Sequence, residues 1–424
     1  MIELEIEGIV TGGEGIARHE GLAVFVPFAA PGDRVRAELI SEKPSYARAL
    51  IREIVEPGPG RIEPKCPAFG RCGGCQLQHL DYPAQLEAKR AIVQEAFRRI
   101  AHLDPSIASV LPGDPWHYRN KVHWAVDGKR IGLFEPRSHR IVEAYPCLIQ
   151  HPLNNLVLDF FRRMLKEFPF VDLRSAFAKV GTHTDELMIG IVTRGEAFPQ
   201  AEWVAEVRTQ FPGVRAIVQN IHPAPGNALL GKKTLVLWGK DEITERLGDL
   251  TYAVSARSFF QVNSLQAEVL YGEVARLAGL TGNELVYDCF SGTGSIALFL
   301  AKHAREVVGI EEIPDATKNA RRNAQLNGVE NARFLTGLVE DLLPGMACPD
   351  AVILDPPRKG CEPSVLDTLL ATRPRRVVYV SCNPATLARD AALLCAGGYR
   401  LEEVTPVDMF PQTAHVECVA AFSR

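Results

Sequence analysis

The chain has 424 residues, a net charge of −4, and 46% hydrophobic and 23% charged side chains. This composition excludes a largely disordered chain, and the length predicts two to four domains. No apolar run reaches the roughly 18–20 residues of a spanning helix, and the start MIELEIEGIV lacks the basic region of a secretory signal. We therefore expect a cytoplasmic protein without membrane contact, whose ten cysteines serve as thiols, metal ligands or catalysts rather than as disulfides.

The charge is unevenly distributed along the chain. Residues 1–57 hold six Lys and Arg against ten Asp and Glu, residues 58–150 hold thirteen against nine, and the remainder holds 28 against 32. Residues 58–150 are therefore the better candidate for electrostatic contact with nucleic acid, although ordinary solvated charge explains the excess equally well.

Residues 1–57 are typical of a small β-barrel. Short strand-like stretches alternate with Gly-rich turns, and four or five strands in so short a segment favour closure, which removes exposed edges. The predicted strands cover residues 4–10, 22–27, 34–40 and 47–55. A Pro- and Gly-rich stretch over 56–64 then indicates a domain boundary.

Residues 58–250 are predicted to form an α+β domain. It starts with a cysteine-rich segment and a helix over 83–100, followed by a hairpin over 121–136 with Asp127 and Gly128 as its turn. A helix over 153–168 and strands over 186–192, 214–219 and 234–238 complete this part.

Residues 251–424 show a different pattern, in which strands and helices alternate. The predicted strands cover 285–289, 307–310, 351–355 and 377–381, and the predicted helices cover 295–303, 314–327 and 385–395. This alternation indicates crossover units and a parallel, doubly wound, Rossmann-like sheet. The fold class is therefore α/β, with a small β-barrel and an α+β domain in front of the sheet.

The stretch YDCFSGTGSIALFLA, residues 287–301, is typical of a strand, a glycine loop and a helix that together bind a nucleotide. Gly292 and Gly294 permit a tight turn and close approach to a ligand, and the helix start offers free N–H groups. Glu311 ends the next strand, where its carboxylate can accept both ribose hydroxyls of an adenosine. The same residues fit a dinucleotide fingerprint, so a nicotinamide-dependent oxidoreductase remains a rival hypothesis, as does a glycine turn without ligand.

The stretch ILDPPRKG places Asp355 at the carboxyl end of a strand, where open α/β sheets bind ligands. Pro356 and Pro357 stiffen the chain after it. A dehydrogenase has no evident need for this rigid loop, whereas an enzyme that holds a flat base beside a methyl donor does. A purely structural turn is the alternative.

The stretch YVSCNPATLARD ends a strand with Cys382 and then starts a helix. Asn383 is a good N-cap, and Pro384 occupies the first helical position. Because a helix N-terminus lowers the pKa of a nearby thiol, we predict that Cys382 is a nucleophile, with an inert buried cysteine as the alternative.

The closing stretch VDMFPQTAHVECVAAF places Glu417 in a terminal strand that is otherwise apolar. An acid in such a strand is costly to bury unless it is paired or used, so Glu417 is a second candidate site residue. A Glu417 that faces the surface is the alternative.

Three cysteines, Cys66, Cys72 and Cys75, lie within ten residues and include the glycine-rich stretch CGGC, and Cys147 follows later. Four thiolates can hold a [4Fe–4S] cluster with a structural role. Zinc, with His79 in place of Cys147, is the alternative ligand set, and free thiols are a third possibility.

The stretches SCNPATLARD and DMFPQTAHVE together resemble the two C-terminal motifs of the RNA uracil-5-methyltransferase family. The DPPRKG loop and the glycine loop are similar to the family as well. The barrel resembles a TRAM domain and the cysteine spacing occurs in members that carry a [4Fe–4S] cluster, so the resemblance covers nearly the whole chain. Ser295 departs from the pattern, since some members have Asn there.

The resemblance implies an enzyme that transfers a methyl group from S-adenosylmethionine to C5 of a uridine. Since no protein partner is evident, we expect a monomer. The resemblance also implies that Cys382 adds to C6 of the base and that Glu417 removes the C5 proton. Ribosomal RNA, in the 23S molecule, is the implied substrate, with transfer RNA as the alternative. The cofactor would be bound by Gln261, Phe290, Glu311 and Asp355. A non-catalytic RNA-binding iron–sulfur protein is the second rival hypothesis.

RNA must be held while the target uridine is flipped out of its stack. The predicted phosphate contacts are Arg119, Lys121, Lys129, Arg130, Arg137 and Arg140. The rings among them, which are predicted to stack on bases or to belong to the core, are Trp116, His117, Tyr118 and Trp124. The acidic barrel needs one local basic face for such contact, and the candidates are Arg34, Arg36, Lys43 and Arg48.

Overall fold

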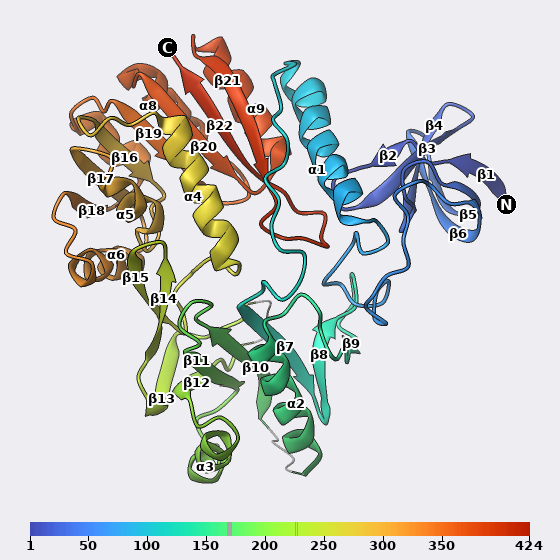
Figure 1. The fold of residues 1–424 in the computed structure, drawn as a ribbon, viewed down its shortest axis with the longest axis horizontal. Helices are drawn as coiled ribbons and strands as arrows, with labels where there is room; N and C mark the ends of the chain where they lie inside the picture. Colours follow the sequence, from blue (N-terminus) through green and yellow to red (C-terminus); the bar gives the residue numbers. More distant parts are fainter. Residues whose placement is uncertain (168–171, 225, 227) are drawn as a thin grey trace.

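The computed structural model describes residues 1–167, 172–224, 226 and 228–424. In these residues, the chain forms a six-stranded sheet, two seven-stranded sheets and a two-stranded hairpin. The barrel, the central sheet and the C-terminal sheet occupy three separate regions of the molecule (Figure 1). No helix in the described ranges is both long and apolar enough to cross a membrane.

The first sheet closes on itself as a barrel, as predicted. Strands β1 and β2 lie at opposite ends of the strand order, yet only Ile6 and Glu7 separate them in sequence. The Glu7 amide donates to the Ile16 carbonyl at 2.8 Å, which holds this connection against β3. The interior is filled by small Ala and Val side chains. The strands are β1 (Ile2–Glu5), β2 (Gly8–Ile9), β3 (Glu14–His19), β4 (Leu22–Pro27), β5 (Arg34–Lys43) and β6 (Tyr46–Glu56).

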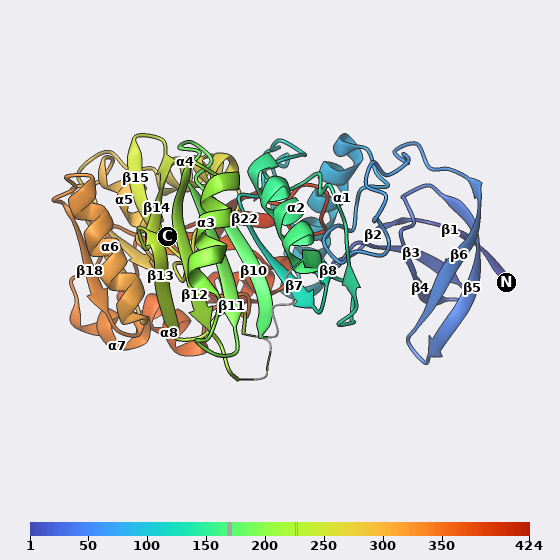
Figure 2. The ribbon, with the colours of Figure 1, turned by 90° about the horizontal axis from the view of Figure 1, so that it is seen from below.

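The central sheet has the strand order β13-β12-β11-β10-β7-β8-β9. Its strands are β7 (Lys121–Asp127), β8 (Arg130–Phe134), β9 (Ile141–Val142), β10 (Leu173–Val180), β11 (Leu187–Thr193), β12 (Val214–Ile221) and β13 (Lys233–Gly239). Helices α2 (Pro152–Glu167) and α3 (Gln200–Gln210) pack in one core on one face of this sheet (Figure 2). The predicted end of the first of these helices, residue 168, lies outside the described residues.

The turn of the predicted hairpin is shifted by one residue. Asp127 pairs with Arg130 across the two strands, so Gly128 and Lys129 form the two-residue turn instead of Asp127 and Gly128. Gly128 has a φ of +58°, which the first central position of a type II′ turn requires and which glycine adopts without strain.

The C-terminal sheet has the strand order β18-β17-β16-β19-β20-β22-β21, with only β22 antiparallel to its neighbours. The chain crosses in opposite directions from β16 toward β17 and toward β19, so the carboxyl ends of these strands form the switch point where ligands bind. The strands are β16 (Leu285–Cys289), β17 (Glu306–Glu311), β18 (Ala332–Thr336), β19 (Ala351–Leu354), β20 (Arg376–Ser381), β21 (Arg400–Val407) and β22 (Glu417–Ser423).

Helices cover both faces of this sheet, which confirms the predicted α/β class. They are α4 (Ser264–Ala278), α5 (Ser295–Ala301), α6 (Pro314–Leu326), α7 (Val339–Leu342), α8 (Pro363–Thr372) and α9 (Pro384–Ala396). The hairpin of β14 (Glu242–Leu247) and β15 (Leu250–Ser255) connects the central sheet to α4.

Helix α1 (Tyr82–Ala96) and the π-helical turn after it (Phe97–Ala101) belong to the C-terminal core, although they precede the central sheet in sequence. The helix starts where the Asp81 carboxylate accepts a hydrogen bond from the Ala84 amide at 2.8 Å. Its buried Val93 and Phe97 join the core that holds the β16 and β20 side chains. Figure 1 shows α1 beside α9, far along the chain.

Candidate active site

One cavity of about 1590 Å³ lies at the carboxyl ends of the C-terminal strands and extends to the cysteine segment. It contains every site residue that the sequence singled out. These are Cys66, Cys72, Cys75, Cys147, Gln261, Phe290, Glu311, Asp355, Cys382 and Glu417. The predicted cofactor, catalytic and metal positions, which span 352 residues of sequence from 66 to 417, therefore share a single space.

The glycine loop between β16 and α5 has an unusual backbone. Gly292 and Gly294 have φ values of +54° and +81°, and Phe290, which is not a glycine, has +68°. A Cβ on Gly294 would lie 2.8 Å from the Phe334 ring, so only glycine fits there. Left-handed backbone at a bulky residue is strained, and such strain concentrates at ligand sites.

Glu311 holds this loop in place. One carboxylate oxygen accepts from the Gly292 amide at 2.9 Å, and the other accepts from the Ile313 amide at 2.8 Å. The side chain is buried at the end of β17 and lines the cavity. Its carboxylate thus shapes the loop and still borders the space where a ribose would lie.

Asp288 is a buried acid that the sequence analysis missed. One oxygen accepts from the Ala297 amide at 2.9 Å, and the other has no partner among the described residues. Burial raises the pKa of this carboxyl well above its ordinary value. An acid inside an apolar strand directly before a glycine loop was the available signal. Ser295, where the sequence departs from the family pattern, forms a hydrogen bond between its hydroxyl and the Tyr271 hydroxyl at 3.0 Å.

The segment that carries Gln261 is held by the central sheet. The Asn120 amide donates to the Val262 carbonyl at 2.8 Å, and the Asn120 side chain donates to the Gln261 carbonyl at 3.3 Å. The buried Lys179 ammonium donates to the carbonyls of Ser255 and Ser258. Asn120, which directly precedes β7, and Lys179 of β10 therefore hold the segment that presents Gln261 to the cavity.

Cys382 lies at the junction between β20 and α9, as predicted. Asn383 caps the helix by accepting from the Ala385 amide at 3.2 Å, and the helix starts at Pro384. The predicted lowering of the thiol pKa is wrong. Burial, and next the charges of Glu417 and Asp355, raise the pKa of Cys382 to about 11, because these effects outweigh the helix N-terminus.

Glu417 begins β22 and is buried, which excludes the alternative of a surface-facing side chain. Burial, together with the charge of Asp355, raises its pKa to about 8, and Arg358 opposes this shift. Burial likewise raises the pKa of Asp355 to about 7. Two carboxyl groups that titrate near neutral pH beside a thiol form an acid–base site.

Arg358 is the cation that balances this acidic group, and the sequence analysis did not assign it. Its carbonyl accepts from the Asn383 side chain at 3.1 Å, which fastens the Asp-Pro-Pro-Arg loop to the start of α9. The guanidinium is exposed at the cavity, forms no ion pair among the described residues, and lowers the pKa of both Cys382 and Glu417.

The four predicted metal-binding cysteines converge at the other end of the cavity. Each is a free thiol, and Cys66, Cys72 and Cys147 all contribute to raising the pKa of Cys75, whose largest cause is burial. Among the described residues, no group of three or more His, Cys, Asp or Glu side chains is arranged to hold a metal ion.

His79 lies apart from these thiols. It packs against the rings of Phe28 and Phe69, and its Nε2 lies 3.1 Å from the Ala29 carbonyl. It does not line the cavity, whereas Cys147 does. The structure therefore disfavours a ligand set in which His79 replaces Cys147.

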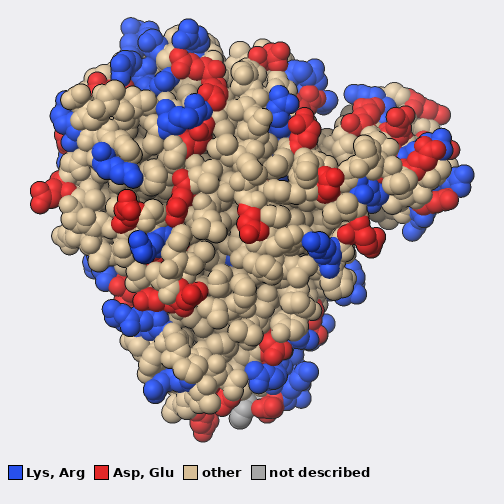
Figure 3. Space-filling view, in the orientation of Figure 1, with Lys and Arg blue, Asp and Glu red and all other residues tan. Residues whose placement is uncertain are grey.

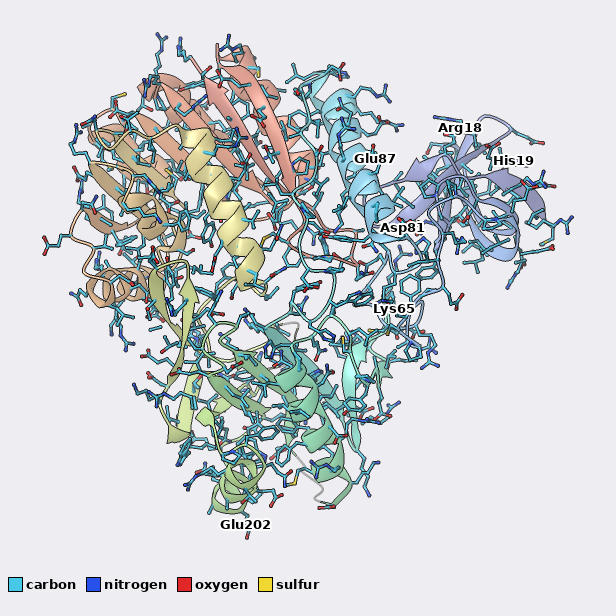
Figure 4. The ribbon with its side chains drawn as sticks, in the orientation of Figure 1. Arg18, His19, Lys65, Asp81, Glu87 and Glu202 are labelled. Carbon is cyan, nitrogen blue, oxygen red and sulfur yellow. The ribbon has the colours of Figure 1, made fainter. Side chains whose placement is uncertain are left out.

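The predicted RNA-stacking rings divide into core and surface. Trp124 is 0% exposed and Tyr118 is 4% exposed, so their assignment to base stacking is wrong. Trp124 packs between the central sheet and α2, and the Tyr118 hydroxyl donates to the Pro411 carbonyl at 2.9 Å. His117 is exposed, and Trp116 is half-buried under the Lys65 ammonium, which lies 5.3 Å from the ring centre. Figure 4 shows Lys65 in the segment between the barrel and the central sheet.

The predicted cations also differ in environment. Arg119 lines the cavity without an ion pair in the described ranges, and Lys121 is half-buried. The exposed Arg130, Arg137 and Arg140 each lie within 4.0 Å of a carboxylate, whereas the exposed Lys129 forms no ion pair with any described residue.

Comparison with known proteins agrees with this arrangement. Family models match residues 1–51 (TRAM domain), 264–377 (TRM5/TYW2 methyltransferase domain) and 338–424 (tRNA (Uracil-5-)-methyltransferase). An uncharacterised RNA methyltransferase of Halalkalibacterium halodurans is 42% identical, covering 99% of this chain and 96% of that protein. A second, from Oceanobacillus iheyensis, is 40% identical and covers 98% and 95%.

A solved structure is similar over the full length. Pyrococcus abyssi tRNA (uracil-54, C5)-methyltransferase, in complex with S-adenosyl-L-homocysteine, has a TM-score of 0.80 at 29% identity and covers 99% of this chain and 100% of that one. The chain belongs to the RNA uracil-5-methyltransferase family. It is an S-adenosylmethionine-dependent RNA methyltransferase with an N-terminal TRAM domain.

Proposed function

We propose that this enzyme methylates C5 of a uridine in ribosomal RNA through a covalent bond between Cys382 and C6 of the base. The observation that supports this most directly is that Cys382, Glu417 and the glycine loop all line one cavity. A nicotinamide-dependent oxidoreductase would use the glycine loop and Glu311 but would leave the thiol and the buried acid without a role.

In the proposed reaction, Cys382 and Glu417 each act in a separate step. The Cys382 thiolate adds to C6, and the electron pair displaced by the new S–C bond makes C5 nucleophilic. S-adenosylmethionine, when bound, supplies the methyl group that C5 takes. Glu417 then removes the C5 proton, the S–C6 bond breaks, and its electron pair returns to sulfur as the C5–C6 double bond reforms. Covalent addition replaces one difficult step by easier ones.

Proton positions follow from the local charges. With the pKa of Cys382 at about 11, the thiol is protonated at neutral pH and must lose its proton before it attacks. The nearby Asp355 and Glu417 carboxylates can accept that proton, and Arg358 stabilises both the thiolate and the carboxylate forms.

The chain's residues fit the methyl donor. The glycine loop leaves open space at Gly292, where a Cβ would meet nothing within 4 Å, and it turns in a left-handed conformation next to Glu311. We assign cofactor binding to Gln261, Phe290, Glu311 and Asp355. The Ser291 hydroxyl, which lies in this loop and lines the cavity, has no partner among the described residues and provides a further polar group.

We also propose that Cys66, Cys72, Cys75 and Cys147 hold a [4Fe–4S] cluster, which would tie the cysteine segment to the central sheet. The four thiols share one end of the cavity, beside the apolar side chains of Ala68, Val142 and Ile149. A single tetrahedral zinc draws its sulfurs to within about 3.8 Å of one another, from Zn–S bonds near 2.3 Å, whereas a four-iron cluster needs a wider frame.

The substrate, domain limits, oligomeric state and location are parts of the same proposal. We propose three domains over 1–57, 58–250 and 251–424 in a monomeric, cytoplasmic enzyme. Transfer RNA is the second candidate substrate, because the structurally similar Pyrococcus abyssi enzyme is a tRNA methyltransferase.

Trapping with RNA that contains 5-fluorouridine tests the mechanism, because fluorine at C5 blocks the last proton removal. We expect a stable RNA–protein adduct with the methyl donor present, and none from Cys382→Ala. An adduct that forms equally well with Cys382→Ala would refute the nucleophile. Mapping 5-methyluridine in ribosomal and transfer RNA from cells with and without the gene then identifies the substrate.

A further inference from the structure

The loop over residues 408–415, between β21 and β22, connects the sheet to Glu417. Phe410, Thr413 and His415 line the active-site cavity, and Glu417 follows two residues later. The loop has few hydrogen bonds of its own. The Thr413 hydroxyl donates to the Phe410 carbonyl at 2.8 Å and accepts from the His415 amide at 3.2 Å. Its conformation must therefore be maintained from outside.

Gln412, at the centre of this loop, has a strained backbone. Its φ is +70°, in the left-handed region that residues with a side chain rarely adopt, and the residue is 3% exposed. Strain of this kind persists only where the surroundings over-determine the conformation, and it concentrates at functional sites.

Hydrogen bonds from two distant segments hold Gln412. The Gln85 side chain, on α1, accepts from the Gln412 amide at 3.0 Å and donates to its side-chain oxygen at 3.0 Å. The amides of Gln76 and Leu77 both donate to the Gln412 carbonyl at 3.0 Å. The main-chain amide, carbonyl and side chain of one strained residue are thus all fixed by residues over 300 positions away.

The first residues of the loop are held by the same helix. The buried Lys89 ammonium donates to the Asp408 carboxylate and, at 3.0 Å, to the Phe410 carbonyl. The Tyr82 hydroxyl donates to Asp408 at 3.0 Å. In Figure 1 the loop lies beside the lower end of α1.

We propose that Gln85 and Gln412 are positioning residues of the methyl transfer site, whose paired side chains hold loop 408–415 in the conformation that places Glu417 in the cavity. This inference rests on the proposed role of Glu417 as the base. Neither glutamine lines the cavity, so each acts through the loop. Gln76 and Leu77 follow Cys75 directly, so the cysteine segment is connected to the base through the same residue.

The test is Gln85→Leu, which keeps the volume but removes both bonds to Gln412. We expect adduct formation on 5-fluorouridine RNA at the wild-type rate, because Cys382 is held by β20 and α9. On ordinary RNA we expect release to slow by about 10–100-fold, the cost of a small misplacement of a catalytic group, so that covalent complex accumulates. Denaturing gels measure both quantities.

Gln219→Leu is the matched control. Gln219 is a buried glutamine of β12 that bonds to Thr193 and to neighbouring carbonyls, and it lies outside the cavity lining. We expect it to lose stability without accumulating covalent complex. If Gln85→Leu releases RNA at the wild-type rate, or slows adduct formation as much as release, the proposal is overturned.

Gln412→Gly provides a second variant in case Gln85→Leu does not fold. Glycine relieves the left-handed strain while it removes the side-chain bond, so the fold is retained. If this variant accumulates covalent complex, the proposal is supported. If it releases RNA at the wild-type rate, the proposal is overturned. Failure of the wild-type enzyme to form any adduct with 5-fluorouridine RNA would instead refute the proposed function, and the positioning role with it.

Discussion

The barrel and the active-site cavity both carry arginines, but the two regions use them differently. On the barrel, Arg34, Arg36 and Arg48 pair with Glu56, Glu53 and Glu14 at 2.6–2.7 Å. Figure 3 shows basic and acidic side chains next to one another on the barrel surface. At the cavity, Arg257 and Arg322 are paired with Asp315 and Glu242. Arg119 and Arg358 also line the cavity, and they form no ion pair with any described residue.

This difference indicates where contact with an RNA phosphate contributes most to binding. An arginine that already holds a carboxylate gives up that partner when it binds a phosphate, whereas an unpaired arginine does not. The predicted basic face of the barrel is thus largely neutralised, with Lys43 unpaired among the described residues. We expect strong RNA contact at the cavity and weak contact at the barrel.

The largest expected effect concerns the chemistry itself. Cys382→Ala should reduce methylation to background while RNA still binds, because the cavity cations are intact. Cys348→Ala is the control, since Cys348 is exposed and lies outside the cavity. Transfer of a labelled methyl group and RNA binding are measured on the same variants. If Cys382→Ala loses RNA binding together with methylation, the prediction is contradicted.

The second effect is a pH dependence. Since the pKa of Glu417 is raised to about 8, its carboxylate form, which is the proposed base, becomes more abundant as pH rises. Release of the covalent complex should accelerate about tenfold per pH unit below pH 8 and level off above it. Glu417→Gln should release slowly at every pH. A flat profile for the wild-type enzyme in single-turnover assays would contradict the base role.

The third effect separates core rings from surface rings near the cavity. Trp124→Ala should destabilise the fold by about 3–5 kcal/mol, because it empties a fully buried site. Trp116→Ala removes a half-buried ring and should cost less than about 1 kcal/mol. Denaturant unfolding measures both. Equal losses would show that Trp116 belongs to the core as well.

The smallest expected effect is on the salt dependence of RNA binding, and it compares the cavity with the barrel directly. Arg119→Gln should lower the slope of log affinity for RNA against log salt by about one, as expected for one lost phosphate contact. Arg36→Gln, whose side chain is paired with Glu53, should leave that slope unchanged. If the barrel variant changes the slope as much as the cavity variant, the two regions contribute equally to RNA binding.

Much of the fold followed from local patterns. The alternation of strands and helices after residue 251 predicted the parallel sheet, and Pro and Gly signals located α6 and α9 to within two residues. The barrel was predicted without β3, because its Gly13 and Gly15 are typical of a turn. These patterns depend on residues that are close in sequence, so the sequence alone is enough to predict them.

The sequence supplied candidate residue types for the site but not the electrostatics around them. The N-terminus of the helix after Cys382 is visible in the sequence. The burial of Cys382 and the nearby carboxylates of Glu417 and Asp355, which raise its pKa, arise only when separate strands come together in the sheet. The same limit applied to Trp124 and Tyr118, since a ring beside basic residues can face either way.

The sequence by itself determined the elements, the glycine loop and the candidate nucleophile, base and thiols, because each depends on residue type and short spacing. Only the tertiary structure decided that these groups share one cavity, which arginines are already paired, and that α1 holds Gln412 in a strained conformation. Those facts arise from contacts between residues hundreds of positions apart, and the free energy of burial and charge depends on such contacts.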